Sequence, residues 1–216
     1  MRKTLLLCAV LICNFAGIAN AQNDAKAKAI LDAVSKKMTA LKSLKADFAL
    51  HLAAANGKLK DTKKGTIVLK GQKYRVTLPG QEIINDNKTV WTYLKDANEV
   101  QVATFNPNDQ GISPAKFFTN FYDKEYSYKY AGTRKVNNKN CDIIELTPIA
   151  KNKPFTKVEL AVDKATSTIA GGNIWEKSGN KYQYDISAFT PNAAVTDAQF
   201  TFDAKKYPGV EVVDLR

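Results

Sequence analysis

The stretch from Gly65 to Leu94 constrains the fold of this chain most, because it contains four short extended segments in a row. Apolar and polar residues alternate there with a period of two, and Gly, Pro, Asn and Asp interrupt the alternation. This pattern is typical of an antiparallel meander, whose apolar face other parts of the chain must cover. The predicted strands are Thr66–Lys70, Lys73–Leu78, Gln81–Asn85 and Thr89–Leu94.

The same alternation occurs on both sides of this meander and predicts about eleven strands in all. The additional strands are Lys45–Ala53, Asn98–Phe105, Glu125–Tyr130, Lys139–Thr147, Phe155–Val162, Thr166–Glu176 and Lys181–Phe189. Near the C-terminus, Asp197–Phe202 is expected to return to the sheet and Val210–Val213 to add one short strand. Such regular spacing favours a single sheet that is strongly curved or partly closed.

Two helices are predicted beside the strands. The first is capped by Asn23 or Asp24 and runs to about Leu41, with its apolar residues three and four positions apart. Its stripe consists of Ala27, Ile30, Leu31, Val34, Met38 and Leu41. The second, a short central helix, begins at Ser113 and Pro114 and is rich in aromatic residues, among them Phe117 and Phe121. The predicted class is therefore α+β, mainly antiparallel β.

Residues 1–21 have the features of a cleaved secretory signal peptide. Arg2 and Lys3 precede the uncharged apolar segment Leu5–Ile18, and the small residues Ala19 and Ala21 flank Asn20 at a cleavage site. We expect an exported, periplasmic protein in which residues 22–216 form one domain. The only cysteine in that domain is Cys141, so no internal disulfide is expected.

The chain carries a formal net charge of +11. Two interpretations stay open: simple solubility, or attraction to an anionic membrane surface or an acidic partner. The run Lys58–Lys64 carries four lysines against one aspartate and is either a solvated hairpin end or a docking site. Nucleic acid is not expected as a partner, because the lysines are scattered rather than interleaved with exposed aromatic residues.

Signals of catalysis are sparse in this sequence. His51 is the only histidine, so a zinc site of several histidines is excluded. A nucleophile elbow, a P-loop and a dinucleotide-binding glycine motif are all missing from the sequence. Cys141 is interpreted as a small buried residue rather than a nucleophile. No catalytic residue, metal or cofactor is therefore predicted, and a binding protein is favoured.

A curved sheet with an amphipathic helix has two apolar surfaces that face one another and suits acyl chains. The helix would then act as a lid on the sheet. The predicted acyl-binding residues come from the helix stripe, from one face of the strands and from the central helix. They are Ile30, Leu31, Val34, Met38, Leu41, Phe48, Leu50, Tyr74, Val76, Trp91, Tyr93, Phe117 and Phe121.

Short motifs in a fixed order suggest a known family. They are Leu44-Lys45-Ala46-Asp47-Phe48, GTIVLK at 65–70, KYRV at 73–76, IINDNKTVWTY at 83–93, SPAKFF at 113–118, and FTFD with PGVEVVD at 200–214. With this order, the sequence resembles the periplasmic outer-membrane lipoprotein carriers of the LolA family over nearly the whole of residues 22–216.

The resemblance implies an incomplete β-barrel, open on one side and covered by helices, without enzymatic activity. It implies a monomeric carrier of acylated lipoproteins that takes its cargo from an inner-membrane ABC transporter of the Lol type. Delivery would be to an outer-membrane acceptor, either a protein or the bilayer. The family's lid-holding arginine corresponds to Lys70, which is followed here by Gly71 instead of proline. Lys70 is thus the predicted lid contact.

Three alternatives to the carrier stay open from the sequence. A lipid-sensing regulator or general lipid-binding module would use the same half-barrel. An enzyme acting on a lipid or glycan would need a positioned acid–base or nucleophile set. A structural interaction protein with a permanently packed core would take up no exchangeable ligand.

Overall fold

The computed structural model describes residues 24–107 and 122–216 of the chain. These residues form one sheet of twelve strands in the order β12-β6-β5-β4-β3-β2-β1-β11-β10-β9-β8-β7. Neighbouring strands are antiparallel, except that β12 runs parallel to β6. The two ends of this order, β12 and β7, do not pair with each other, so the barrel is unclosed, as the sequence predicts.

The strands are bounded as follows: β1 Leu44–Ala53, β2 Leu59–Lys70, β3 Lys73–Leu78, β4 Gln81–Asn85, β5 Thr89–Leu94, β6 Glu99–Thr104, β7 Tyr126–Val136, β8 Lys139–Pro148, β9 Phe155–Asp163, β10 Thr168–Glu176, β11 Lys181–Pro191 and β12 Glu211–Asp214. The helices are α1 Ala25–Thr39, α3 Tyr122–Glu125 and the 3-10 turns η1 Asp197–Phe200 and η2 Ala204–Lys206.

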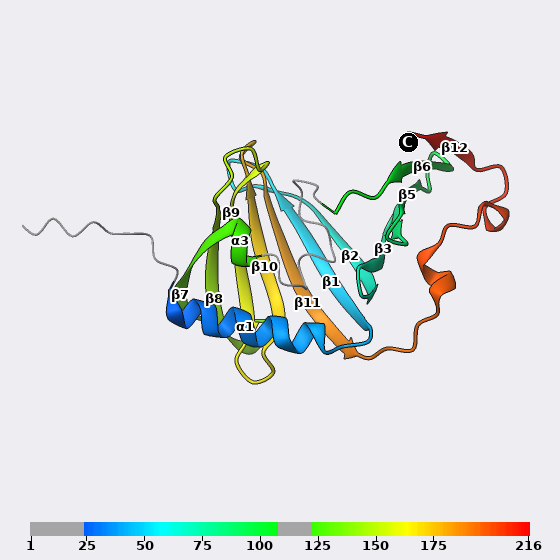
Figure 1. Ribbon diagram of the computed structural model, residues 1–216. Coiled ribbons are helices and arrows are strands. Elements are labelled where there is room, and N and C mark those ends of the chain that lie inside the picture. Colours follow the sequence, from blue (N-terminus) through cyan, green and yellow to red (C-terminus); the bar gives the residue numbers. More distant parts are fainter. Residues whose placement is uncertain (1–23, 108–121) are drawn as a thin grey trace, which may run out of the picture.

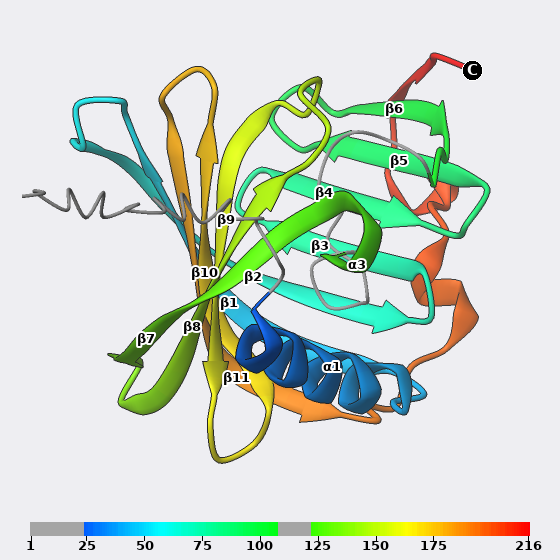
Figure 2. The same ribbon diagram turned by 60° about the vertical axis from the view of Figure 1, so that its left-hand side comes forward.

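The sheet is curved, with β3–β6 forming one wall and β7–β10 the other, as Figure 1 shows. Helix α1 crosses the concave side near one end of the strands, and the chain after β11 passes over the outer side of β3–β6 (Figures 1 and 2). We call residues 192–216 the C-terminal strap. The sheet is thus covered on opposite faces by two segments that are far apart in sequence.

The main apolar core lies between α1 and the concave face. Its buried members come from α1, β1–β3 and β7–β11, and from α3 through Tyr122. At Gly65 the neighbouring strands and the Phe48 ring approach so closely that a β-carbon would lie 2.6 Å from the carbonyl oxygen of Thr77. A side chain at this position would therefore push apart the centre of the concave face.

Most predicted strand bounds agree with the structure, and those of β3, β4 and β5 agree at both ends. Two expectations need correction. Strand β2 begins at Leu59, so part of the lysine-rich run is paired with β1 rather than loop. Residues 197–200 form the turn η1 instead of a strand, although Phe200 does reach the sheet and is fully buried. The predicted helix start at Ser113 lies outside the described residues.

Candidate functional site

The concave apolar face is the candidate site, because four predicted strand residues meet the helix stripe there. Phe48, Tyr74 and Val76 are buried in the core cluster, and Leu50 is half-buried against it. Phe48 pairs with Gly65 of β2, while Tyr74 and Val76 pair with Leu69 and Ile67. Their side chains therefore share one face across three strands.

Helix α1 packs its stripe closely on this face. Leu31 is 1 % exposed, Val34 5 % and Met38 6 %, whereas Ile30 and Leu41 are only partly buried at the edge of the stripe. The three central residues of the stripe are thus closely packed in the closed state. The contact is apolar in its middle, since the buried residues of α1 are Ala, Leu, Val and Met.

The N-terminal end of α1 is fixed to β7 through Asp24. One carboxylate oxygen caps the helix by accepting the backbone N–H groups of Lys26 at 2.8 Å and Ala27 at 3.2 Å. The other accepts the N–H of Tyr130 at 3.0 Å, and the N–H of Asp24 donates to the Tyr128 carbonyl. The Tyr130 N–H, followed by those of Ala27 and Lys26, holds the pKa of Asp24 below its ordinary value.

The C-terminal end of α1 is fixed to the segment that follows β11. The backbone N–H of Lys42 donates to Asn192 Oδ1 at 2.9 Å, and the Ser43 hydroxyl donates to the Ala193 carbonyl at 2.6 Å. The Lys37 ammonium also donates to the Thr166 carbonyl in the β9–β10 turn. The sequence shows only the chain link of residues 42–44 between helix and sheet. The structure adds polar contacts at both ends of α1 and one in its middle, from the Tyr122 hydroxyl to Asp32 at 3.3 Å.

A second group of apolar residues on the concave face is half-buried. These residues pack against the core cluster from β1, β3, β4, β10 and β11, and they are Leu50, Leu78, Ile83, Ile174 and Tyr184. Burial raises the pKa of Tyr184 to about 12, so its phenol is neutral throughout the physiological range. Apart from Leu50, the sequence analysis missed this group, although the strand alternation that identified Tyr74 and Val76 extends to Leu78.

Trp91 and Tyr93 do not belong to the concave face, and this prediction is wrong. Trp91 pairs with Ile84 and Tyr93 with Glu82, while Ile84 itself pairs with Arg75. Directly paired residues share a face of the sheet. Trp91 and Tyr93 therefore point to the outer face, whereas Tyr74 and Val76 point to the concave face.

The C-terminal strap covers the outer face of this half of the sheet and explains why Tyr93 is buried there. The ring centroid of Tyr93 lies 5.7 Å from that of Phe202 and 4.6 Å from that of Tyr207. The rings of Phe202 and Tyr207 stack on each other. Arg75 donates to the Gln199 carbonyl at 3.2 Å and to the Tyr207 hydroxyl at 3.3 Å. The outer face therefore carries a second apolar layer.

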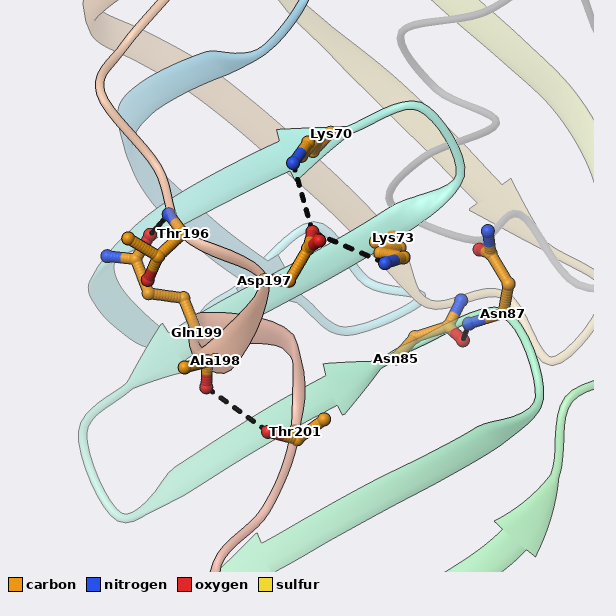
Figure 3. A network of polar contacts seen from close by, with 9 residues as sticks. All are labelled: Lys70, Lys73, Asn85, Asn87, Thr196, Asp197, Ala198, Gln199 and Thr201. Atoms are coloured by element: carbon orange, nitrogen blue, oxygen red, sulfur yellow. Dashed lines mark hydrogen bonds and ion pairs between the residues drawn. The ribbon is translucent and has the colours of Figure 1, made fainter.

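Lys70 also lies on the outer face. The prediction that it contacts the lid is wrong, because its partner is Asp197 in the C-terminal strap. Its ammonium lies 3.0 Å from Asp197 Oδ1 in η1, and Lys73 approaches the same oxygen at 3.3 Å (Figure 3). Lys70 pairs directly with Lys73 at the β2–β3 turn, which places both ammonium groups on one side. Phe117 and Phe121, the two remaining predicted site residues, lie outside the described residues.

The titratable side chains in the described part of the chain form no metal site. No cluster of three His, Cys, Asp or Glu residues that could hold a metal occurs within residues 24–107 and 122–216. Cys141 is fully buried, and desolvation, followed by the charge of Asp163, raises the pKa of its thiol. The His51 ring contacts both neighbouring strands: its Nε2 lies 3.2 Å from Asp185 Oδ2, and its Nδ1 lies 3.0 Å from the Thr62 hydroxyl. No helix within the described ranges is long and apolar enough to cross a membrane.

Comparison with known proteins identifies the family. The model of the family described as outer membrane lipoprotein carrier protein LolA matches residues 39–203. The chain belongs to the LolA family. An outer-membrane lipoprotein carrier protein of Shewanella loihica is 25 % identical over 188 residues, which are 85 % of each chain. A conserved Thermus thermophilus protein of known structure superposes with a TM-score of 0.58 at 16 % identity, over 88 % of this chain and 99 % of that one.

The range that matches the LolA family covers most of the sheet. Residues 39–203 contain all strands from β1 to β11 and the turn η1, which carries Asp197. Helix α1 lies before this range except for Thr39, and β12 lies after it. The concave sheet face therefore lies within the range that matches the LolA family.

Proposed function

We propose that this LolA-family protein is a periplasmic carrier that binds the acyl chains of lipoproteins on its concave apolar face. The observation that supports this most strongly is the half-buried group Leu50, Leu78, Ile83, Ile174 and Tyr184 beside an apolar helix contact. Transfer of a methylene group from water to an apolar environment gains about 0.8 kcal/mol. A sixteen-carbon chain would thus gain on the order of 12 kcal/mol before the costs of ordering it.

Helix α1 is the element that makes room for the cargo in this proposal. Its buried side chains are apolar, so acyl chains can replace their contacts with the sheet. In the middle of the helix, Asp32 would give up the hydrogen bond that it accepts from the Tyr122 hydroxyl at 3.3 Å. The polar contacts of Asp24 and of residues 42–43 keep both ends of the helix near the sheet. A cargo shifts α1 only as far as it binds the displaced state more tightly than the closed one.

The remaining steps follow from the lipoprotein-carrier function. The protein would be exported by the signal peptide of residues 1–21 and would act as a single domain in the periplasm. It would receive acylated lipoproteins from an inner-membrane ABC transporter of the Lol type and release them at the outer membrane. Its role would be binding and transfer, without chemistry on the cargo.

The test is to identify what the protein carries. Protein isolated from the periplasm of its own organism should yield acylated lipoproteins in mass spectrometry. Leu50→Asp places a charge on the concave face and should abolish this loading, because acyl chains cannot pair with a carboxylate. Ala49→Asp is the matched control, since Ala49 is an equally half-buried neighbour whose side chain points to the other face.

Two outcomes would contradict the proposal. Recovery of free phospholipid or fatty acid alone would indicate a general lipid-binding module instead of a lipoprotein carrier. Equal loading of the Leu50→Asp and Ala49→Asp variants would show that the concave face is not the binding site.

A further inference from the structure

Three turns project at the end of the sheet that lies away from α1, and they carry lysines and two exposed apolar side chains. They are the β1–β2 turn (54–60), the β8–β9 turn (149–154) and the β10–β11 turn (176–181), as Figures 1 and 2 show. We call these three segments the basic rim. Strand β10 separates the rim from the β9–β10 turn that contacts α1, and its nine residues span about 30 Å.

The three turns are in contact with one another. A β-carbon on Gly179 would lie 2.6 Å from the β-carbon of Ala55, so the β10–β11 and β1–β2 turns touch. On its other side, the N–H of Lys177 donates to the Pro154 carbonyl at 2.9 Å, and its ammonium donates to the Lys151 carbonyl. The rim is therefore one continuous surface.

The charge of the rim is strongly positive. Its segments contain six lysines and one acidic residue, Glu176. Of these six lysines, Lys153 is paired with a carboxylate, that of Glu125 at 2.7 Å, and its side chain is 7 % exposed. The other five lysines have no carboxylate partner within the described ranges; they are Lys58, Lys60, Lys151, Lys177 and Lys181.

The rim also carries exposed apolar side chains among these lysines. Leu59 lies between Lys58 and Lys60 and is 57 % exposed, and Ile149 begins the β8–β9 turn and is 64 % exposed. In the described part of the chain, they are two of only four large hydrophobic residues with such exposure. The other two, Val212 and Leu215, are on or next to β12, where they provide a natural comparison.

We propose that the basic rim docks this protein onto the surface of an anionic lipid bilayer. Lysines near such a surface gain electrostatic attraction, while apolar side chains enter the boundary between headgroups and acyl chains. The rim combines both kinds of side chain on projecting turns, which a flat bilayer can contact simultaneously. Its five lysines that have no carboxylate partner among the described residues complement a surface of dispersed negative charge better than one fixed acidic partner.

This docking goes beyond the carrier function proposed above. The carrier function explains why docking would be useful, but docking does not depend on it. With the rim on the bilayer, α1 would lie at the far end of the strands and would be free to move. Docking itself needs no cargo, so it can be measured on the empty protein. A protein that docks but carries no lipoprotein would contradict the proposed function and leave this inference intact.

The experiment measures flotation of the protein with vesicles of phosphatidylcholine containing phosphatidylglycerol, and with vesicles of phosphatidylcholine alone. The unaltered protein should bind the anionic vesicles, and binding should weaken with added salt. The triple variant Lys58→Gln, Lys60→Gln, Lys177→Gln should lose at least roughly tenfold in partitioning, since one lysine at such a surface contributes about fivefold. The control variant Lys88→Gln, Lys205→Gln, Lys206→Gln changes the same charge on exposed residues elsewhere and should bind nearly as the unaltered protein.

A second pair of variants separates insertion from simple attraction. Leu59→Ser with Ile149→Ser should weaken binding several-fold, whereas Val212→Ser with Leu215→Ser should not. Equal losses in the two lysine variants would overturn the proposal, because net charge alone would then explain the binding. Failure of the unaltered protein to bind anionic vesicles would overturn it too, whether or not the rim binds a protein acceptor instead.

Discussion

Helix α1 and the C-terminal strap cover opposite faces of the same sheet, but different kinds of contact hold them. The middle of α1 is held to the sheet by apolar side chains. Its polar contacts lie mainly at its two ends, with one in between, where Asp32 accepts a hydrogen bond from the Tyr122 hydroxyl at 3.3 Å. The strap adds a strand ladder between β12 and β6, together with ion pairs and hydrogen bonds from Lys70, Lys73 and Arg75. The two covers therefore differ in what could replace their contacts with the sheet.

The difference shows which cover is exchangeable. Acyl chains offer apolar surface but neither hydrogen-bond donors nor acceptors in their hydrocarbon part. They can take over the contacts of Leu31, Val34 and Met38, but not those of a backbone ladder. Displacing the strap would leave the carbonyls of Asn98 and Val102 without their present donors, the N–H groups of Glu211 and Leu215. We therefore expect cargo to move α1 and to leave the strap in place.

The largest expected effect comes from the strap. Phe200 is a fully buried side chain of the strap itself, so Phe200→Ala should lower the free energy of unfolding by about 3–5 kcal/mol. Urea denaturation followed by circular dichroism would measure this change. Leu215→Ala, at a residue that is 61 % exposed, is the control and should change the free energy by less than about 0.5 kcal/mol. A loss below about 1 kcal/mol for Phe200→Ala would show that the strap is a loose cover.

The next effect concerns α1 and separates it from the strap. Leu31→Ala should lower the free energy of unfolding by about 2–5 kcal/mol, since this side chain is 1 % exposed. It should also tighten the binding of a fluorescent fatty acid, because a weaker helix contact makes the open state more populated. Phe200→Ala should leave the affinity of the folded protein unchanged. The same change of affinity in both variants would remove the distinction between the two covers.

The smallest effect is electrostatic and belongs to the strap. Hydrogen bonds from Lys70 and then Lys73 hold the pKa of Asp197 below its ordinary value of 3.8. The carboxylate therefore stabilises the fold fully above that value, and its contribution is lost as the pH falls through the lowered pKa. Asp197→Asn should slightly lower the urea midpoint at neutral pH, and this difference should vanish in acid. Because the pair is exposed, the change should be small. A difference that is independent of pH would exclude the ion pairs as its cause.

Much of the fold could be predicted from the sequence, because the strands alternate cleanly and their turns carry Gly, Pro, Asn or Asp. The bounds of β3, β4 and β5 followed from this pattern alone. The assignment of faces failed at Trp91 and Tyr93 for a physical reason. Alternation shows which residues of one strand share a face, but not which face is buried, and here the strap gives the outer face an apolar layer of its own.

The anchoring of the site was less predictable, because it depends on contacts between distant parts of the chain. Asp24 was expected as a helix cap, and the structure confirms the cap. Its second carboxylate oxygen, however, binds a residue 106 positions away. Lys70 likewise lies 127 positions from Asp197. No local pattern identifies such partners, so the sequence located the apolar surfaces but not the polar contacts that hold them together.

Displacement of α1 by cargo can be tested most directly through the reactivity of a cysteine in that helix. Val34 is buried against the sheet, whereas its neighbour Ala33 is exposed on the outer side. Each would be changed to cysteine in protein whose Cys141 has been replaced by serine, and labelled with a maleimide. Val34→Cys should react slowly in the empty protein and many times faster when lipoprotein is bound, while Ala33→Cys should react rapidly in both states. Equal protection of Val34→Cys in empty and fully loaded protein would contradict the claim.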